Sequence, residues 1–548
     1  MVFGEKDKIV VINIGYKITK GSFMSYIKEM KIIGFKKFRN FYIEFNKNMN
    51  ILVGENEAGK STILEAINIV LNQFYKNIDK SIIKDLINID NVIEFKKNPS
   101  IETLPKIQIQ IKLELDESNN KYEYFGENNL EENEEYGILF ECYFDKDSYG
   151  DMLEDKINQE EIPYEYYTMT WTTFQGSAYK VMKKPLKSII IDTSTIDSSN
   201  SFNYYNKMLF NSIYNDIDKL EIKNAVRVGL NKVIKENINE FDTNRYFGIN
   251  NKKVIFESII SVFENDIPLE NKGKGIENLI KTKIALNKSK TKLDLVMIEE
   301  PENHLCHSNL LKMLEQIKEQ VENNQIIITT HNNLIASRLN LRNVIWIDKE
   351  KSESLGDIDS KISKFFEKVD NNNFLQLLLA KKVILVEGAT EYLLIPSIYE
   401  KVTGAKMEND GITVISCNGI SYKNYLEIGK KANKKIAVIT DNDKSQDKID
   451  EMNEFNNDKE NKKQHIFMDK DIKNWTWEVC IYNLNEEKLK TFIKINEKFD
   501  YKFNDEDYGK YLGKMLNNKV ETAYEMLTSN LEFEIPEYVK DAIKWIKN

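Results

Sequence analysis

Cysteine is scarce in this chain of 548 residues, which has only Cys142, Cys306, Cys417 and Cys480. These four residues lie far apart in the sequence. Their spacing argues against a disulfide framework and against a zinc site built from paired cysteines. We therefore expect reduced, buried thiols.

Long hydrophobic runs are also lacking. No stretch of about eighteen apolar residues occurs, and the first residues do not combine a charged segment with an apolar one. The sequence thus predicts a cytoplasmic protein without a membrane-spanning segment. Sustained heptads are missing between residues 130 and 270, which argues against a long coiled coil there.

The composition permits a large hydrophobic core but does not indicate what the protein binds. Hydrophobic residues make up 41% of the chain and charged residues 30%, and a chain of this length usually folds into about two to four domains. The formal net charge of −10 is neutral evidence about nucleic acid, because a local basic groove can coexist with an acidic total.

Apolar runs alternate with segments of helical periodicity, a pattern typical of α/β domains with mostly parallel sheets. The first unit has a strand at 49–53 and a helix at 61–71, and it continues far downstream with strands at 295–298 and 325–329. A second βαβαβ unit begins near residue 381. Its strands are expected at 383–386, 412–416 and 436–440.

The run Gly54-Glu55-Asn56-Glu57-Ala58-Gly59-Lys60-Ser61 has the spacing of a P-loop. In such a loop the backbone N–H groups wrap a phosphate, the lysine reaches the terminal phosphates and the hydroxyl faces Mg²⁺. The strand before the loop and the helix after it make a chance match less common. The sequence therefore predicts an ATP site that uses Gly54, Gly59, Lys60 and Ser61.

The second half of an ATP site is expected at the acidic end of the strand 295–298. There we expect Glu299 to contact the magnesium shell and Glu300 to orient the attacking water. Paired acids of this kind are equally common in solvated turns, so the assignment depends on the P-loop. One strand later, His331 is placed to sense the γ-phosphate, although a lone histidine is more often structural.

These residues resemble the ABC-type ATPase heads of chromosome-maintenance proteins and of the overcoming lysogenization defect (OLD) family of nucleases. The resemblance covers about residues 30–75 and 270–350, and it includes the run Phe38-Arg39-Asn40-Phe41. It implies further nucleotide contacts from Arg39, Asn56, Ala58 and Thr62. In such heads a serine-glycine signature completes the ATP site across a dimer, but the run Lys272-Gly273-Lys274-Gly275 lacks the serine. Whether ATP is turned over in the usual way or mainly bound is therefore left open.

Acidic residues also follow the strands of the second unit: Glu387, Glu391, Asp441 and Asp443. Strand ends in a parallel sheet share one edge. Carboxylates gathered there repel one another and raise each other's pKa unless cations hold them, so we expect Mg²⁺ or Mn²⁺. Two such metals can activate water against a phosphodiester. For a single member of the set, a surface acid is the commoner explanation.

The run from Val386 to Glu391, the pair Asn418-Gly419 and Asp441-Asn442-Asp443 resemble a Toprim domain over residues 380–480. In OLD-like proteins a further glutamate and a late lysine assist catalysis, and the resemblance assigns these roles to Glu478 and Lys519. A head followed by a Toprim domain is the OLD arrangement, and the chain most resembles the nuclease subunit of Gabija-type anti-phage systems.

The expected fold class is therefore α/β, with an ABC-type P-loop head, a mostly helical insertion and a Toprim domain. The expected segments are an N-terminal extension of unknown role at 1–29, the first part of the head at 30–130, a largely helical insertion and possible dimerisation region at 131–268, the second part of the head at 269–350, a linker at 351–379 and the Toprim domain with a C-terminal helical part at 380–548.

The resemblance implies an ATP-regulated, metal-dependent DNA endonuclease or nickase of anti-phage defence. It would act on double-stranded DNA as a homo-oligomer, a dimer or a tetramer, with a helicase as a candidate partner. Two alternatives remain open: an ATP-binding sensor or scaffold with a weak or silent nuclease, and a DNA-repair ATPase.

Overall fold

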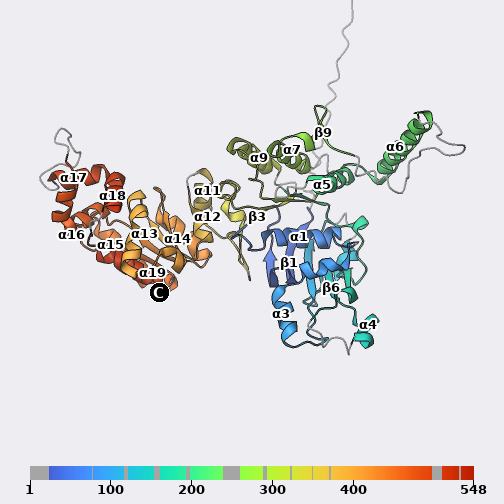
Figure 1. The fold of residues 1–548 in the computed structure, drawn as a ribbon, viewed down its shortest axis with the longest axis horizontal. Coiled ribbons are helices and arrows are strands. Elements are labelled where there is room, and N and C mark those ends of the chain that lie inside the picture. Colours follow the sequence, from blue (N-terminus) through green and yellow to red (C-terminus); the bar gives the residue numbers. More distant parts are fainter. Residues whose placement is uncertain are drawn as a thin grey trace, which may run out of the picture.

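The computed structural model shows two units joined by a narrow middle segment (Figure 1). The N-terminal unit contains two sheets, and the C-terminal unit contains one. Helices α11 (Ser360–Lys368) and α12 (Phe374–Leu379) lie between them. The structure describes residues 24–76, 78–116, 121–153, 161–192, 198–237, 260–287, 293–320, 324–348, 350–369, 372–495, 509–529 and 532–548.

The central sheet of the N-terminal unit has the strand order β14-β13-β3-β12-β11-β8. All neighbouring strands are parallel except the edge pair of β13 and β14. Every residue of β3 is buried, because layers of protein cover both faces of a parallel sheet. The strands are β3 (Met49–Gly54), β8 (Ser188–Asp192), β11 (Leu295–Glu299), β12 (Gln325–Thr329), β13 (Val344–Ile347) and β14 (Ser352–Ser354).

The second sheet is antiparallel, with the order β2-β1-β4-β6-β5 and β7 paired to β6. Helix α1 (Lys60–Asn72) lies between the two sheets, which explains why its apolar side chains are buried nearly all round. Its last carbonyls are capped by Trp171 Nε1 at 2.9 Å and Tyr179 Oη at 2.8 Å. The strands are β1 (Tyr26–Phe35), β2 (Phe38–Glu44), β4 (Ile107–Glu114), β5 (Phe125–Gly126), β6 (Glu135–Phe144) and β7 (Tyr167–Thr173).

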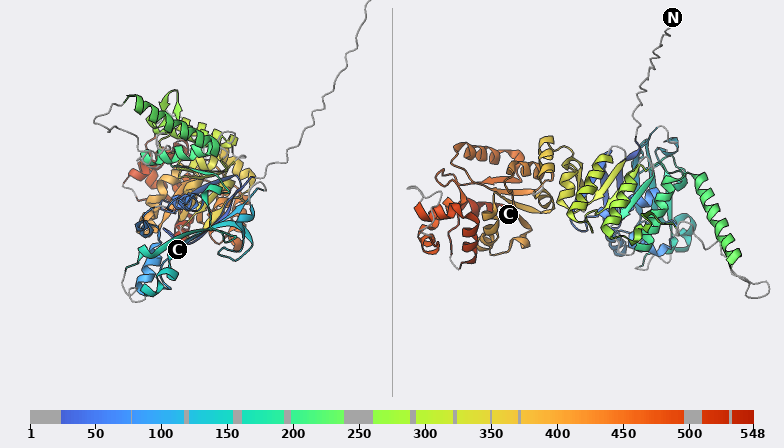
Figure 2. Two further views of the ribbon diagram at one scale, coloured as in Figure 1. Left: turned by 90° about the vertical axis from the view of Figure 1, so that its right-hand side faces the viewer. Right: turned by 90° about the horizontal axis from the view of Figure 1, so that it is seen from above.

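The segment 131–268 was expected to be largely helical, but its first half contains strands. It supplies β6 and β7 to the antiparallel sheet and β8 to the central sheet. Buried Ile138, Phe140 and Cys142 recur at every second position, the period of a strand rather than of a helix. Helices α5 (Ser198–Ile213) and α6 (Asp216–Asn237) follow, and α6 extends away from the rest of the unit (Figure 2).

Several helices complete the N-terminal unit. Helices α7 (Lys274–Leu286) and α9 (His307–Gln320) pack against each other beside the central sheet, and α10 (Asn333–Arg338) follows β12 directly. The remaining helices are α2 (Ile83–Leu86), α3 (Ile89–Lys97) and α4 (Lys146–Leu153).

The C-terminal unit is built on a parallel sheet with the order β16-β15-β17-β18. One face packs on α13 (Ala389–Thr403) and α19 (Glu537–Lys547), and the other on α14 (Tyr422–Lys431) and α15 (Gln446–Asn457). The other elements are β15 (Lys382–Val386), β16 (Ile412–Ser416), β17 (Lys435–Ile439), β18 (Gln464–Phe467), α16 (Trp477–Phe492), α17 (Gly509–Asn517) and α18 (Lys519–Thr528).

The segment 351–379, expected to be a linker, is folded. It contains β14, α11 and α12, and buried Phe366, Phe374 and Leu378 belong to one core with the central sheet and the α14 side of the C-terminal sheet. Within this segment, Asn372 is buried and hydrogen-bonded. The two units are therefore joined by continuous packing.

Three smaller expectations can also be compared with the structure. Strand β1 begins at Tyr26, so part of the segment 1–29 belongs to the head, and residues 1–23 lie outside the described part of the chain. Cys142, Cys417 and Cys480 are buried free thiols, but Cys306 is exposed. Among the described helices, none is both long and apolar enough to cross a bilayer.

Candidate functional site

The P-loop connects β3 to α1 and has the backbone geometry that phosphate binding requires. Gly59 has a φ of 100°, and a Cβ there would lie 2.3 Å from Cζ of Phe38, so both conformation and space call for glycine. Lys60 begins α1 and donates through Nζ to the carbonyls of Gly54 and Glu55, both at 3.0 Å. The loop thus places a lysine and a helix N-terminus together.

Burial lowers the pKa of Lys60 to about 8, although Glu300, Glu302 and Glu299 act in the opposite direction. A bound polyphosphate would supply the negative charge that this buried ammonium needs. The cavity beside it has a volume of about 430 Å³. Its lining residues are Lys37, Asn56, Glu57, Gly59, Lys60, Ser61, Thr62, Glu300 and His331.

The acidic wall of this cavity comes from the end of β11. Burial raises the pKa of Glu299, whose carboxylate is hydrogen-bonded by Ser61. Glu300 has a left-handed backbone with a φ of 43° and accepts from Asn303 Nδ2 at 2.9 Å. These two acids therefore stand beside the phosphate loop.

His331 faces Glu300 across 3.7 Å between Nε2 and Oε1. Burial and the nearby Lys60 lower the pKa of His331, so its imidazole is neutral near pH 7. Glu302 holds this turn, accepting from Thr330 Oγ1 at 2.7 Å and from the His331 N–H at 2.9 Å. Sequence reasoning missed Glu302, which follows the expected pair by two residues.

Two expected nucleotide contacts lie elsewhere. Arg39 is exposed and pairs with Glu94 at 2.6 Å, because β2 directs it to the outer surface of the sheet. Ala58 lines a neighbouring cavity rather than the phosphate cavity. Lys37, which sequence reasoning did not select, lines the phosphate cavity. It is one of two adjacent lysines before Phe38, so the motif alone did not single it out.

The altered signature run opens α7. A Cβ at Gly275 would lie 2.4 Å from the His304 carbonyl oxygen, so this glycine lets α7 approach the turn after β11. Glycine is therefore required at position 275 because α7 packs closely against this turn.

The carboxylates of the C-terminal unit converge at the carboxyl edge of its sheet. Asp441 accepts from Thr476 Oγ1 at 2.7 Å and from the Trp477 N–H at 2.9 Å. Thr476 also contacts Glu478 at 2.9 Å, and Lys519 Nζ lies 2.8 Å from Glu478. These contacts bring Asp441, Glu478 and Lys519 together from β17, α16 and α18.

Two further expected acids join them. Glu387 follows β15 and accepts from the hydroxyl of Thr440. Glu391, on the first turn of α13, is only 7% exposed. A Cβ at Gly388 would lie 3.3 Å from Glu391 Oε2, so the small residue leaves room for this carboxylate.

Burial, with smaller contributions from the charges of Glu478 and Glu387, raises the pKa of Glu391 to about 7. Burial likewise raises the pKa of Asp441 to about 7, with smaller contributions from Glu387, Glu391 and Glu478, while the Thr476 hydrogen bond acts in the opposite direction. Burial opposes the charge on Lys519, but the surrounding acids prevail and raise its pKa. One lysine thus stands among four acids.

Asp443 does not join this cluster. Its backbone is left-handed, with a φ of 50°, and its half-exposed carboxylate pairs with Lys448. The middle residue of the motif is the structural one, because the Asn442 side chain donates to the carbonyls of Asp469, Asp471 and Asn474 at 3.0 to 3.1 Å. It holds the loop that carries Thr476 and Trp477.

The donor set of Glu387, Glu391, Asp441 and Glu478 is all oxygen, which suits Mg²⁺ or Mn²⁺. Within the described residues, no three acidic, histidine or cysteine side chains stand close enough to enclose a metal ion by themselves. The raised pKa values of Glu391 and Asp441 nevertheless fit a divalent cation, because its charge would offset the burial and the repulsion that raise them.

A test of this repulsion is the stability of Glu391→Gln without metal. The pKa of Glu391 is raised from its usual 4.5 to about 7, so stability is lost as the pH rises through this range. At pH 8 we expect the variant to exceed the wild type by about 1–3 kcal/mol in free energy of unfolding, and near pH 5 to match it. Chemical denaturation at both pH values measures this difference.

The control is Glu408→Gln, an exposed glutamate of the same unit, which should change stability by no more than about 0.5 kcal/mol. If Glu391→Gln were no more stable than the wild type at pH 8, Glu391 would not be under electrostatic stress.

Comparison with known families agrees with this geometry. Residues 378–443 match the TOPRIM domain of the overcoming lysogenization defect protein-like family. Residues 26–240 and 199–336 match the AAA ATPase domain family, and together these matches cover more than half of the chain.

Individual relatives are distant. The Old nuclease of Escherichia phage P2 is 25% identical over 233 residues, which are 38% of this chain and 40% of the relative. The DNA replication and repair protein RecF of Clostridium kluyveri is 39% identical over 92 residues, 16% of this chain and 24% of the relative. The chain therefore spans two fifths or less of the length of these relatives.

Two solved structures align with lower similarity. The SMC head bound to the C-winged helix domain of ScpA has a TM-score of 0.33 and 16% identity, over 60% of this chain and 99% of the other. The SMC head domain from Thermotoga maritima has a TM-score of 0.29 and 15% identity, over 60% and 98%. Because the AAA ATPase domain match covers more than half of the sequence, the chain belongs to this family, and its C-terminal unit carries an overcoming lysogenization defect protein-like TOPRIM domain.

Proposed function

We propose that this chain is an ATP-regulated, divalent-metal-dependent DNA endonuclease or nickase of the OLD type. The observation that carries the proposal is the cluster of Glu391, Asp441 and Glu478 beside Lys519 at the edge of the TOPRIM sheet. Buried acids that raise each other's pKa are arranged to bind cations, and strand-end acids are where α/β proteins place their chemistry.

In this proposal Glu387, Glu391, Asp441 and Glu478 hold the metal. A bound divalent ion would supply an activated water and stabilise the leaving oxygen of the phosphodiester. Thr476 orients Asp441 and Glu478 through one hydroxyl, and Asn442 holds the loop that carries Thr476. Lys519 offers its ammonium to the phosphate charge at the same place.

The AAA ATPase domain implies ATP binding, which we propose to be regulatory. Lys60, Ser61 and Thr62 would hold the phosphates, with Glu299 at the magnesium shell and Glu300 as the water-orienting base. His331 would report the presence of the γ-phosphate.

A chain of hydrogen bonds leads from this switch to the TOPRIM sheet. Asn333, two residues after His331, donates to Asn372 O at 2.6 Å and accepts from the Leu375 N–H at 3.1 Å. Asn373 then donates to Ser416 O, at the end of β16, at 3.1 Å. A shift at His331 would therefore reach this sheet through the backbone to Asn333, the bonds of Asn333 to Asn372 and Leu375, and the bond of Asn373 to Ser416.

Double-stranded DNA is the proposed substrate, and anti-phage defence the proposed context, on the strength of the OLD and Gabija resemblance. A homo-oligomer is proposed because α6 exposes Ile217, Leu220, Val228 and Val233, apolar side chains that a second copy would cover. A helicase partner remains part of the proposal on the same resemblance.

The nuclease proposal is tested by nicking of supercoiled plasmid with Mg²⁺ or Mn²⁺. We expect Glu387→Gln and Asp441→Asn to lower the nicking rate by about 100-fold or more, because each removes a carboxylate from the cluster. Asp443→Asn is the matched control, because Asp443 pairs with Lys448 outside the cluster, and it should lower the rate by less than about tenfold. Nicking that survives in both cluster variants would sink the nuclease assignment.

The regulatory proposal is tested by titrating ATP into the same assay. The nicking rate of the wild type should change with ATP, whereas Lys60→Ala should not respond. Asn333→Ala should keep its rate without ATP within about twofold and lose most of the response, because its bonds to Asn372 and Leu375 are gone. Asn409→Ala, an exposed control, should respond as the wild type does. A full ATP response in Asn333→Ala would contradict the polar path.

A further inference from the structure

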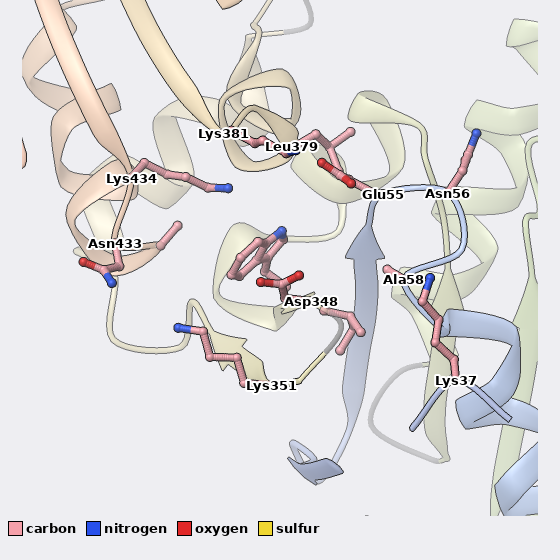
Figure 3. Close-up of a pocket in the computed structure, with 13 residues that line it drawn as sticks. Lys37, Glu55, Asn56, Ala58, Asp348, Lys351, Leu379, Lys381, Asn433 and Lys434 are labelled. Atoms are coloured by element: carbon pink, nitrogen blue, oxygen red, sulfur yellow. The ribbon is translucent and has the colours of Figure 1, made fainter. Parts of the chain in front are cut away.

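A second cavity lies on the other side of the P-loop, where the head meets the TOPRIM domain (Figure 3). It has a volume of about 470 Å³. Lys37, Glu55, Asn56 and Ala58 line it from the loop region, while Lys381 and Lys434 come from the TOPRIM side. Of these residues, Lys37 and Asn56 also line the phosphate cavity. The second cavity thus borders the first but has its own walls.

Lysines dominate the charge of this cavity. Four of them line it, Lys37, Lys351, Lys381 and Lys434, against two acids, Glu55 and Asp348. Lys351 pairs with Glu353 on its own hairpin. Within the described part of the chain, Lys37, Lys381 and Lys434 form no salt bridge. Three lysines that form no salt bridge among the described residues therefore line one cavity (Figure 3).

Lys434 is the most buried of them, at 8% exposure. Its Nζ lies 4.3 Å from the centre of the Trp346 ring and donates to the Ala380 carbonyl at 2.9 Å. Burial lowers the pKa of Lys434 to about 8, although Asp348 and Glu55 act against this. A buried ammonium with only a carbonyl and a ring for partners is costly, and an anion beside it would remove that cost.

Trp346 adds a second unsatisfied donor. Its indole Nε1 is buried and, among the described residues, has no hydrogen-bond acceptor. Leu379 and Ile347 form an apolar wall of the cavity. The cavity therefore offers cations for an anion, carboxylates for hydroxyl groups and an apolar wall for a flat ring.

We propose that this cavity binds a free nucleotide, separately from the P-loop. Its phosphates would lie among Lys37, Lys381 and Lys434, its ribose hydroxyls near Glu55 and Asp348, and its base against Leu379 and Ile347. The volume is within the usual range for small-molecule sites. Because its walls come from both units, a nucleotide here bridges the head and the TOPRIM domain. The proposal does not depend on the nuclease activity.

The test is calorimetric titration of the full chain with ATP in the presence of EDTA. Lys60→Ala removes the P-loop lysine, so the binding that remains reports the second cavity. We expect about one equivalent of ATP to bind Lys60→Ala, and its affinity to fall at least tenfold when Lys434→Met or Lys381→Met is added. Lys430→Met is the matched control, because this exposed lysine of α14 pairs with Glu460 away from the cavity, and it should leave the affinity unchanged.

Lys381 is exposed, so Lys381→Met decides the outcome if Lys434→Met lowers the unfolding temperature. The proposal is overturned if Lys60→Ala binds no ATP, or if neither lysine variant weakens the binding that remains. Displacement of ATP from Lys60→Ala by a short DNA duplex would assign these lysines to DNA and would also overturn it.

Discussion

The burial of several carboxylates close to one another at the edge of the TOPRIM sheet is the constraint on which the rest of the molecule depends. Folding brings Glu391 and Asp441 to one place, and burial raises the pKa of each to about 7. For Glu391 the shift from 4.5 corresponds to a cost on the order of 3 kcal/mol at neutral pH. Lys519 is one cation among several acids, so the cost is only partly offset. Such a site is retained where a bound ligand offsets the unfavourable free energy of the clustered carboxylates.

The rest of the molecule positions this site and connects it to the nucleotide loop. Helix α1 is held between two sheets, which fixes Lys60 at its first turn. The same core that covers β3 continues through α11 and α12 to the face of the TOPRIM sheet that packs on α14. The two sites therefore belong to one packed body, and polar contacts from Asn333 to Asn373 cross the joint between them.

Much of this could be predicted from the sequence, because the strongest signals are local. The strand, loop and helix around Lys60 follow from spacing, and so do the strands that end at Glu387 and Asp441. Acids at parallel strand ends share an edge whatever the rest of the fold. That rule placed Glu387, Glu391 and Asp441 together without knowledge of any contact.

What could not be predicted depends on backbone direction or on distant segments. Asp443 follows Asp441 by two residues, but a left-handed backbone turns it toward Lys448. Thr476 gives no sequence signal, because its role arises only when α16 meets β17. The strands at 135–144 and 167–173 could not be recognised from the sequence, because aromatic residues are frequent there and the period-two alternation is weak. The alternation is weak because both faces of β6 carry apolar side chains.

The most direct test of the central claim is anomalous scattering from crystals of the protein soaked in Mn²⁺. The account predicts a manganese peak at coordinating distance from carboxylate oxygens of Glu387 and Asp441, with none at Asp443. A peak at Asp443, or no manganese near Asp441 at millimolar Mn²⁺, would contradict it.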